Sequence, residues 1–207
     1  MAGIGVAEMK ARLLAGCDAI IAAEERLTEA DRAVGDGDHG LAMARGFRAG
    51  RQALEEKPAE AVGDLFRHLG MAILTTSGGA SGAVFGTFFM SAAKPLAGAE
   101  ATAPALAEAL RAGVEAVQAR GGAAPGDKTM IDAVMPAIAA AEGAGGAAEA
   151  LQAAAEGAAQ GAEATKAMLA KAGKARPLGD RALGHVDPGA LSLSLFLAAL
   201  AEPAGDG

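Results

Sequence analysis

The sequence DRAVGDGDHG, residues 31–40, interrupts a helical chain with three glycines and three aspartates. Gly35, Gly37 and Gly40 match the G-x-G-x-x-G pattern of dinucleotide-binding loops, which present backbone N–H groups to a phosphate. That pattern requires a preceding strand, yet residues 22–34, AAEERLTEADRAV, are polar and typical of a helix. The context therefore argues against a dinucleotide fold.

The carboxylates of Asp31, Asp36 and Asp38 lie within eight residues. An EF-hand loop starting at Asp36 would need different residues at Gly40 and Phe47. On a continuous helix Asp36 would point away from the other two, but the neighbouring glycines predict a turn that could bring all three together. Converging carboxylates repel one another unless a cation lies among them, and oxygen ligands of this kind suit Mg²⁺. A solvated Asp/Gly turn explains the spacing equally well.

The composition predicts one helical domain covering residues 1–207. About half of the residues are apolar and one fifth are charged, with no Trp or Tyr and few β-branched residues. A net charge of −7 without a Lys/Arg cluster disfavours nucleic acid and membrane surfaces as partners. Cys17, the single cysteine, is expected to be a buried apolar side chain. We find no secretory signal, and the apolar run 191–200 is too short to span a bilayer, so we expect a cytoplasmic protein.

Apolar spacing and helix breakers predict eight helices and no strand. The expected helices cover residues 5–29, 40–56, 59–74, 82–94, 104–120, 129–141, 146–171 and 188–202. Four of the intervening breaks combine glycine with Asp, Ser, Thr or His. We therefore expect the chemistry of this protein at the ends of its helices.

The second of these breaks, residues 75–82 (TTSGGASG), consists of small residues before an apolar helix. Its N–H groups and serine hydroxyls could bind phosphate at the helix N-terminus. Close helix packing is an alternative, because Gly82 and Gly86 lie four residues apart on one face.

The third break, GGAAPGDKTM (121–130), nearly matches a Walker A loop. We reject that assignment because Asp127 stands between Gly126 and Lys128 and because a helix, not a strand, precedes the loop. Asp127 or Thr129 is then expected to cap the next helix.

The fourth break, residues 174–190, is an irregular segment that contains His185. We interpret His185, and His68 within a helix, as structural residues. The sequence contains no evident Ser-His-Asp or Cys-His motif.

Four segments in this order, DRAVGDGDHGLAMARGF, TSGGASGAVFGTFF, RGGAAPGDKTMIDA and LGDRALGHVDPGA, make the chain similar to a known family. They resemble the nucleotide-binding L subunit of bacterial dihydroxyacetone kinase, a module that also forms the C-terminal half of single-chain dihydroxyacetone kinases. The resemblance covers essentially the whole chain. It implies an all-α fold, an eight-helix antiparallel barrel or bundle with the nucleotide at one end. It also implies that Asp31, Asp36 and Asp38 hold two Mg²⁺ ions that bridge to the phosphates of ADP or ATP.

The same resemblance implies further nucleotide contacts. They are His39, Gly40, Leu41, Ala42, Ala80, Ser81 and Gly82 near the phosphates, Gly121, Thr129 and Met130 around the adenine, and Lys174, Asp187, Pro188 and Gly189 closing the site. Two positions depart from the family pattern. Ala42 stands where Asn is frequent, and Lys174 stands where Arg is common, which keeps the charge but loses the bidentate fork.

A family member of this kind is half of an enzyme. In the family, dihydroxyacetone is bound by a separate K subunit, and either ATP exchanges as a substrate or ADP stays bound and is rephosphorylated by a phosphotransferase-system protein. A free-standing L subunit favours the second scheme. The alternatives are a kinase subunit for another small ketose, such as a four-carbon sugar, a non-catalytic nucleotide-sensing subunit, and a helical scaffold whose loops are only turns. Both a monomer and a homodimer are compatible with the sequence.

Overall fold

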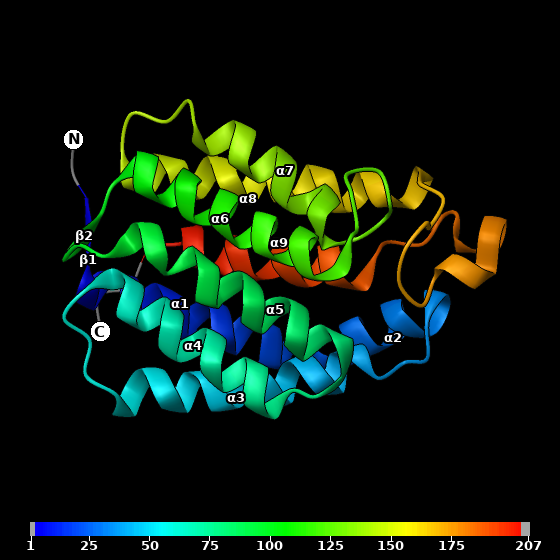
Figure 1. The fold of residues 1–207 in the computed structure, drawn as a ribbon, viewed down its shortest axis with the longest axis horizontal. Helices are drawn as coiled ribbons and strands as arrows, with labels where there is room; N and C mark the ends of the chain where they lie inside the picture. Colours follow the sequence, from blue (N-terminus) through cyan, green and yellow to red (C-terminus); the bar gives the residue numbers. More distant parts are fainter. Residues whose placement is uncertain (1–2, 204–207) are drawn as a thin grey trace.

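The computed structural model describes residues 3–203, and nearly all of its secondary structure is helical (Figure 1). The α-helices are α1 (Val6–Ala22), α2 (Glu24–Val34), α3 (His39–Glu56), α4 (Val62–Thr76), α5 (Gly79–Ala92), α6 (Ala103–Gly121), α7 (Met130–Ala141), α8 (Ala147–Ala164) and α9 (Pro188–Ala201). Three short 3-10 segments are η1 (Lys94–Leu96), η2 (Thr165–Ala167) and η3 (Arg176–Ala182). The strands β1 (Ile4–Gly5) and β2 (Glu100–Ala101) form a two-residue antiparallel pair. The all-α prediction is confirmed.

Eight of the helices form a closed ring. From α3 to α9 each helix packs against the next, and both α3 and α9 pack against α1. The helix α2 extends the bundle at one end, beside the connection between α8 and α9, whereas β1 and β2 lie at the other end (Figure 1). Buried side chains from all nine of these helices meet in one hydrophobic core.

Two of the expected helices depart most from the observed ones, and the other helix boundaries lie within three residues of the prediction. The expected helix 5–29 is divided at Ala23 into α1 and α2 and continues to Val34. The N–H of Ala23 still donates to Ala19, and the carbonyl of Ala23 still accepts from Leu27, so the helical hydrogen bonds cross a one-residue bend. Apolar spacing does not reveal such a bend because the same face stays buried on both sides of it.

The helix expected over 146–171 ends earlier, at Ala164. The Thr165 hydroxyl donates to the carbonyl of Ala162 at 2.6 Å and accepts from the backbone N–H of Asp187 at 2.9 Å. The contact with Asp187, 22 positions away, therefore ends α8, and the local sequence does not predict this helix end.

Small residues and phenylalanines share the packing of the core. The Phe89 ring centroid lies 5.0 to 6.3 Å from those of Phe47, Phe66, Phe88 and Phe196. On the other side of the ring, glycines bring α8 directly onto the backbone of α7, where a Cβ at Gly157 would lie 2.5 Å from a carbonyl oxygen. This close approach explains how an alanine-rich chain fills its interior.

Cys17 is fully buried in this core, as predicted from the sequence. Burial raises the pKa of its thiol to about 12, so the thiol stays protonated and unreactive. No helix within residues 3–203 combines the length and the apolarity needed to cross a membrane.

Candidate functional site

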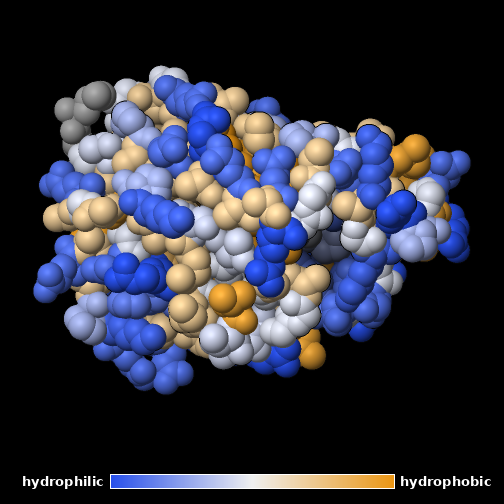
Figure 2. Space-filling model, viewed as in Figure 1, coloured by the Kyte–Doolittle hydropathy of each residue, from blue (hydrophilic) through white to orange (hydrophobic). Residues whose placement is uncertain are grey.

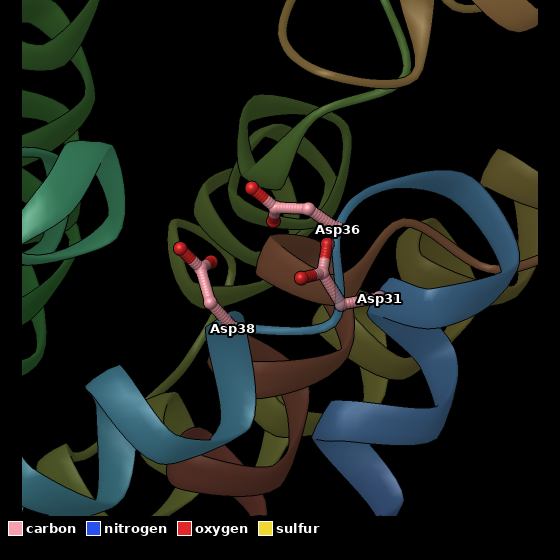
Figure 3. Close-up of side chains that lie close together, drawn as sticks. All are labelled: Asp31, Asp36 and Asp38. Carbon is pink, nitrogen blue, oxygen red and sulfur yellow. The ribbon is translucent and has the colours of Figure 1, made fainter.

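Three aspartates converge at the end of the bundle that carries α2. Asp31 lies in the last turn of α2, Asp36 in the following loop, and Asp38 immediately before α3, and Figure 3 shows their carboxylates turned toward one another. One carboxylate oxygen of each residue lies within 4.8 Å of one from each of the others. Asp31 is buried, whereas Asp36 and Asp38 are exposed. The turn expected from the glycines therefore does bring the three side chains together.

Two glycines make this convergence sterically feasible. A Cβ at Gly35 would collide with the Asp31 carboxylate, and Gly37 adopts a φ of +78°, which favours glycine over other residues. The Asp31 carboxylate also accepts a hydrogen bond from the backbone N–H of His39 at 3.1 Å, across the loop. Asp38 precedes α3 without a capping hydrogen bond from its side chain, so its carboxylate is free for other partners.

Lys174 supplies a cation to this cluster from a distant part of the chain. Its Nζ donates to both carboxylate oxygens of Asp36 at 2.6 Å and to Asp38 at 3.0 Å. The hydrogen bond from Lys174 lowers the pKa of the Asp36 carboxyl, and the bond to Asp36 raises the pKa of the Lys174 ammonium. Three carboxylates and one ammonium leave a net charge of −2 (−3 + 1), which attracts divalent cations.

A small second apolar cluster holds the Lys174 segment against α2. It consists of Val34 from the end of α2 with Ala170, Ala175 and Ala182 from the α8–α9 connection. Residues 166–181 of this connection carry five Lys or Arg and one Asp, which is a local net charge of +4 (5 − 1). The absence of a Lys/Arg cluster inferred from the sequence is therefore wrong for this segment. Figure 2 shows many hydrophilic residues at this end of the molecule.

A cleft of about 260 Å³ opens beside the three aspartates. Its wall combines polar loop residues with an apolar surface formed by Val34, Val84, Phe85, Val117 and Ile131. The cleft is bounded by the ends of α2, α3, α5, α6, α7 and α9, which confirms that helix ends gather the polar residues. Apolar walls with a few convergent polar groups are typical of small-ligand sites.

Most of the expected contact residues line this cleft. They are Asp31, Asp38, His39, Ala80, Ser81, Gly121, Thr129, Met130, Lys174, Asp187, Pro188 and Gly189.

The other five expected residues, Asp36, Gly40, Leu41, Ala42 and Gly82, lie outside the wall of the cleft. A Cβ at Gly40 would collide with the backbone of α2, and one at Gly82 would lie 2.5 Å from Ser77, so both glycines serve close helix packing. Leu41 is 55% exposed, and Asp36 joins the aspartate cluster at the rim of the cleft.

His39 connects three helix ends beneath the cleft. Its Nδ1 lies 2.8 Å from the Ser81 hydroxyl of α5, and its Nε2 lies 2.8 Å from the Ser192 hydroxyl of α9. Burial lowers the pKa of the His39 imidazole, which favours the neutral ring. Ser192 was not among the predicted site residues, because it lies within the apolar helix α9.

Two helix caps also lie at the cleft. Thr129 caps α7 by accepting from the N–H of Ile131, and Asp132 accepts in return from the N–H of Thr129 at 2.8 Å. Of the two candidate caps Thr129 is therefore the one used, while Asp127 closes its own loop through the N–H of Ala124.

Asp187 caps α9 through the N–H of Ala190 at 2.8 Å, and its withdrawal from water raises its carboxyl pKa to about 7.

Lys128 is a polar residue of the cleft that sequence reasoning missed. It is 1% exposed and lines the wall next to Thr129. Lys128 belongs to the near match to a Walker A loop, but nothing in the local sequence indicates that a lysine between Asp127 and Thr129 is buried.

The DAK2 domain family matches residues 33–202 of this sequence. The chain belongs to the DAK2 domain family. It is 40% identical over 197 residues to the ADP-binding subunit DhaL of the PEP-dependent dihydroxyacetone kinase of Escherichia coli K12, covering 91% of this chain and 92% of that protein. It is 35% identical to DhaL of kinase 1 of Listeria innocua, covering 86% of this chain and 87% of that protein. The resemblance to the L subunit is confirmed.

Longer DAK2 proteins match as well. Human triokinase/FMN cyclase is 39% identical over 191 residues, covering 90% of this chain and 33% of that protein. The crystal structure of the dihydroxyacetone kinase of C. freundii in complex with AMP-PNP and Mg²⁺ superposes with a TM-score of 0.76 at 31% identity, covering 97% of this chain and 34% of that one. This DAK2 chain therefore spans nearly the whole of the DhaL subunits but only about a third of these longer kinases.

Proposed function

We propose that this chain is the nucleotide-carrying subunit of a dihydroxyacetone kinase. In this proposal it holds ADP or ATP with Mg²⁺ in the cleft, and the phosphoryl group passes to dihydroxyacetone held by a separate K-type subunit. The observation that carries the proposal is the convergence of three carboxylates beside a partly apolar cleft, in a chain that covers the DhaL subunits almost end to end.

The aspartate cluster fits Mg²⁺ by its donor set. All three side chains offer carboxylate oxygens, and their mutual repulsion favours a divalent cation. Asp31, Asp36 and Asp38 would hold the metal, and we propose two ions on the basis of the family resemblance. Bound Mg²⁺ would offset the negative charge of the nucleotide phosphates, which is the main requirement of phosphoryl transfer.

The remaining wall of the cleft offers a place for each part of the nucleotide. Ala80 and Ser81 lie in the first turn of α5, where free N–H groups and the helix dipole favour phosphate. His39 keeps the Ser81 hydroxyl in position from below. Gly121, Thr129 and Met130, together with the apolar wall, would surround the base, and Asp187, Pro188 and Gly189 would close the site.

We further propose that bound ADP is rephosphorylated by a phosphotransferase-system protein. This scheme is supported by the names of the relatives that this chain matches over most of their length. Two are PEP-dependent, and a third, 34% identical, is the DhaL subunit of a PTS-dependent dihydroxyacetone kinase of Lactococcus lactis. We also propose that the protein acts in the cytoplasm, where ADP and the phosphotransferase-system protein would meet it.

A four-carbon ketose is a second candidate acceptor. The chain is 38% identical over 184 residues to the L-erythrulose 1-kinase of Mycolicibacterium smegmatis, although it covers only 32% of that protein. Since the ketose would bind to the partner subunit, turnover with dihydroxyacetone and with erythrulose in the presence of a K-type subunit distinguishes the two acceptors.

The nucleotide site itself is tested by thermal unfolding of protein freed of bound nucleotide. ADP at about 100 times its dissociation constant should stabilise the chain by about 2.7 kcal/mol, or roughly 5–11 °C, only when Mg²⁺ is present. Asp36→Asn should abolish this shift. Asp180→Asn, which removes an exposed carboxylate of the same end outside the cluster, should retain it. Absence of a shift in the wild-type protein would overturn the proposal, provided that mass analysis shows no ADP left from purification.

A further inference from the structure

Lys128 stands out because it is both buried and held in an unusual backbone conformation. Its side chain donates from Nζ to the carbonyl oxygens of Thr165 and His185, both at 2.6 Å. Its φ of +61° makes it the one non-glycine residue with a positive φ within residues 3–203. Left-handed conformation in such a residue costs free energy, and so does burial of an ammonium whose hydrogen bonds go to neutral carbonyls, even though the Asp187 carboxylate lies near enough to interact with it electrostatically. The surrounding structure must therefore impose this arrangement.

Three chain segments meet around the Lys128 ammonium. The backbone N–H of Lys171 donates to the carbonyl of Asp127 at 3.1 Å, which fastens the Lys128 loop to the chain beyond α8. The N–H of Gly184 donates to the carbonyl of Lys166 at 2.8 Å, which fastens the two ends of the connection to each other.

The connection between Thr165 and Asp187 is the part of the fold that depends on these bonds. It contains no α-helix, yet it brings Lys174 to the aspartate cluster and leads into the α9 cap at the cleft. Lys128 binds one carbonyl at the start of this connection and one near its end. The Lys128 ammonium thus binds both ends of this connection, which separates Thr165 from Asp187 by 22 positions.

We propose that Lys128 is a positioning residue for the nucleotide, which clamps both ends of the 165–187 connection and so fixes the wall of the cleft before the ligand arrives. This inference rests on the proposed nucleotide function. Without the clamp the connection would populate other conformations, and nucleotide would have to select the competent one. The apparent dissociation constant for nucleotide would then equal the intrinsic constant divided by the fraction of molecules in the binding-competent conformation.

The variants Lys128→Met and Lys128→Gly test the clamp in complementary ways. Met keeps the apolar stem without the ammonium, and Gly removes the side chain but accepts the positive φ without strain. Lys171→Met is the matched control, because its side chain is exposed and its backbone bond to Asp127 is kept. Calorimetric titration with ADP in excess Mg²⁺ at 15 °C, far below unfolding, gives the dissociation constant of each protein.

We expect both Lys128 variants to weaken ADP binding at least tenfold and Lys171→Met to leave it within twofold. With a K-type subunit the variants should raise the KM for nucleotide while kcat at saturation stays within about threefold. A purely structural role would instead lower the melting temperature and leave the ADP dissociation constant unchanged at 15 °C. That outcome would overturn the clamp. If the wild-type protein itself bound no ADP, that result would overturn the proposed nucleotide function, on which the clamp rests.

Hydrogen exchange of the wild-type protein tests the same inference without any variant. The amides of Gly184 and Asp187 donate to Lys166 and Thr165 in the clamped arrangement. They should therefore be protected in nucleotide-free protein and exchange faster in any Lys128 variant that folds. Rapid exchange of both amides in nucleotide-free wild type would contradict a clamp formed in advance, even if neither variant folded.

Discussion

Replacing Gly40 with alanine tests how the aspartate cluster is assembled. Gly40 lies in the first turn of α3, where a Cβ would overlap the carbonyl oxygen of Glu24 and the hydroxyl of Thr28 and lie 2.6 Å from the Thr28 backbone nitrogen. These atoms belong largely to the backbone of α2 and cannot turn aside. The helix that carries Asp31 must therefore move away from the helix that begins after Asp38.

The expected cost is that of overpacking a close contact, about 2–3 kcal/mol. For a chain of this length that corresponds to a fall in melting temperature of roughly 4–12 °C. Separation of the two helices should also weaken the Mg²⁺-dependent stabilisation by ADP, because the three carboxylates no longer converge.

Differential scanning calorimetry with and without Mg²⁺ and ADP measures both effects. Gly143→Ala is the matched control, since its Cβ would lie 3.9 Å from the nearest atom and the residue is in an exposed turn. The control should unfold within about 1 °C of wild type. If Gly40→Ala keeps both the wild-type melting temperature and the full ADP shift, close packing of α2 on α3 does not assemble the cluster.

Three further outcomes are expected. Lys174→Gln should tighten Mg²⁺ binding to nucleotide-free protein roughly fivefold by calorimetry, since it removes a positive charge from the aspartate cluster; weaker binding would contradict the charge argument. Arg12→Met should cost about 2 kcal/mol in urea unfolding, because the buried guanidinium donates to three carbonyls at the end of α9, whereas Glu8→Gln should cost under about 0.5 kcal/mol. Cys17 should resist thiol reagents at pH 8 until the chain is unfolded, because a pKa of about 12 leaves almost no thiolate; rapid labelling of native protein would contradict its burial.

The sequence by itself determined the helical class, the position of most helices and the group of aspartates. Helical periodicity is local, so each amphipathic segment indicates its own structure. The Asp/Gly spacing at 31–40 predicted a turn because Gly35 and Gly37 tolerate the close approach and the positive φ that it needs. Burial of Cys17 followed from the same local reasoning.

Only the tertiary structure decided which distant side chains contact one another at the site, although the family resemblance had already named Lys174 and His39 as members of it. Lys174 reaches Asp36 across 138 positions, Ser192 reaches His39 across 153, and Lys128 reaches His185 across 57. The end of α8 at Ala164 depends in the same way on the contact between Thr165 and Asp187. Such contacts arise from the closing of the helical ring, which sets residues far apart in sequence against one another, and no periodicity within a single helix records them.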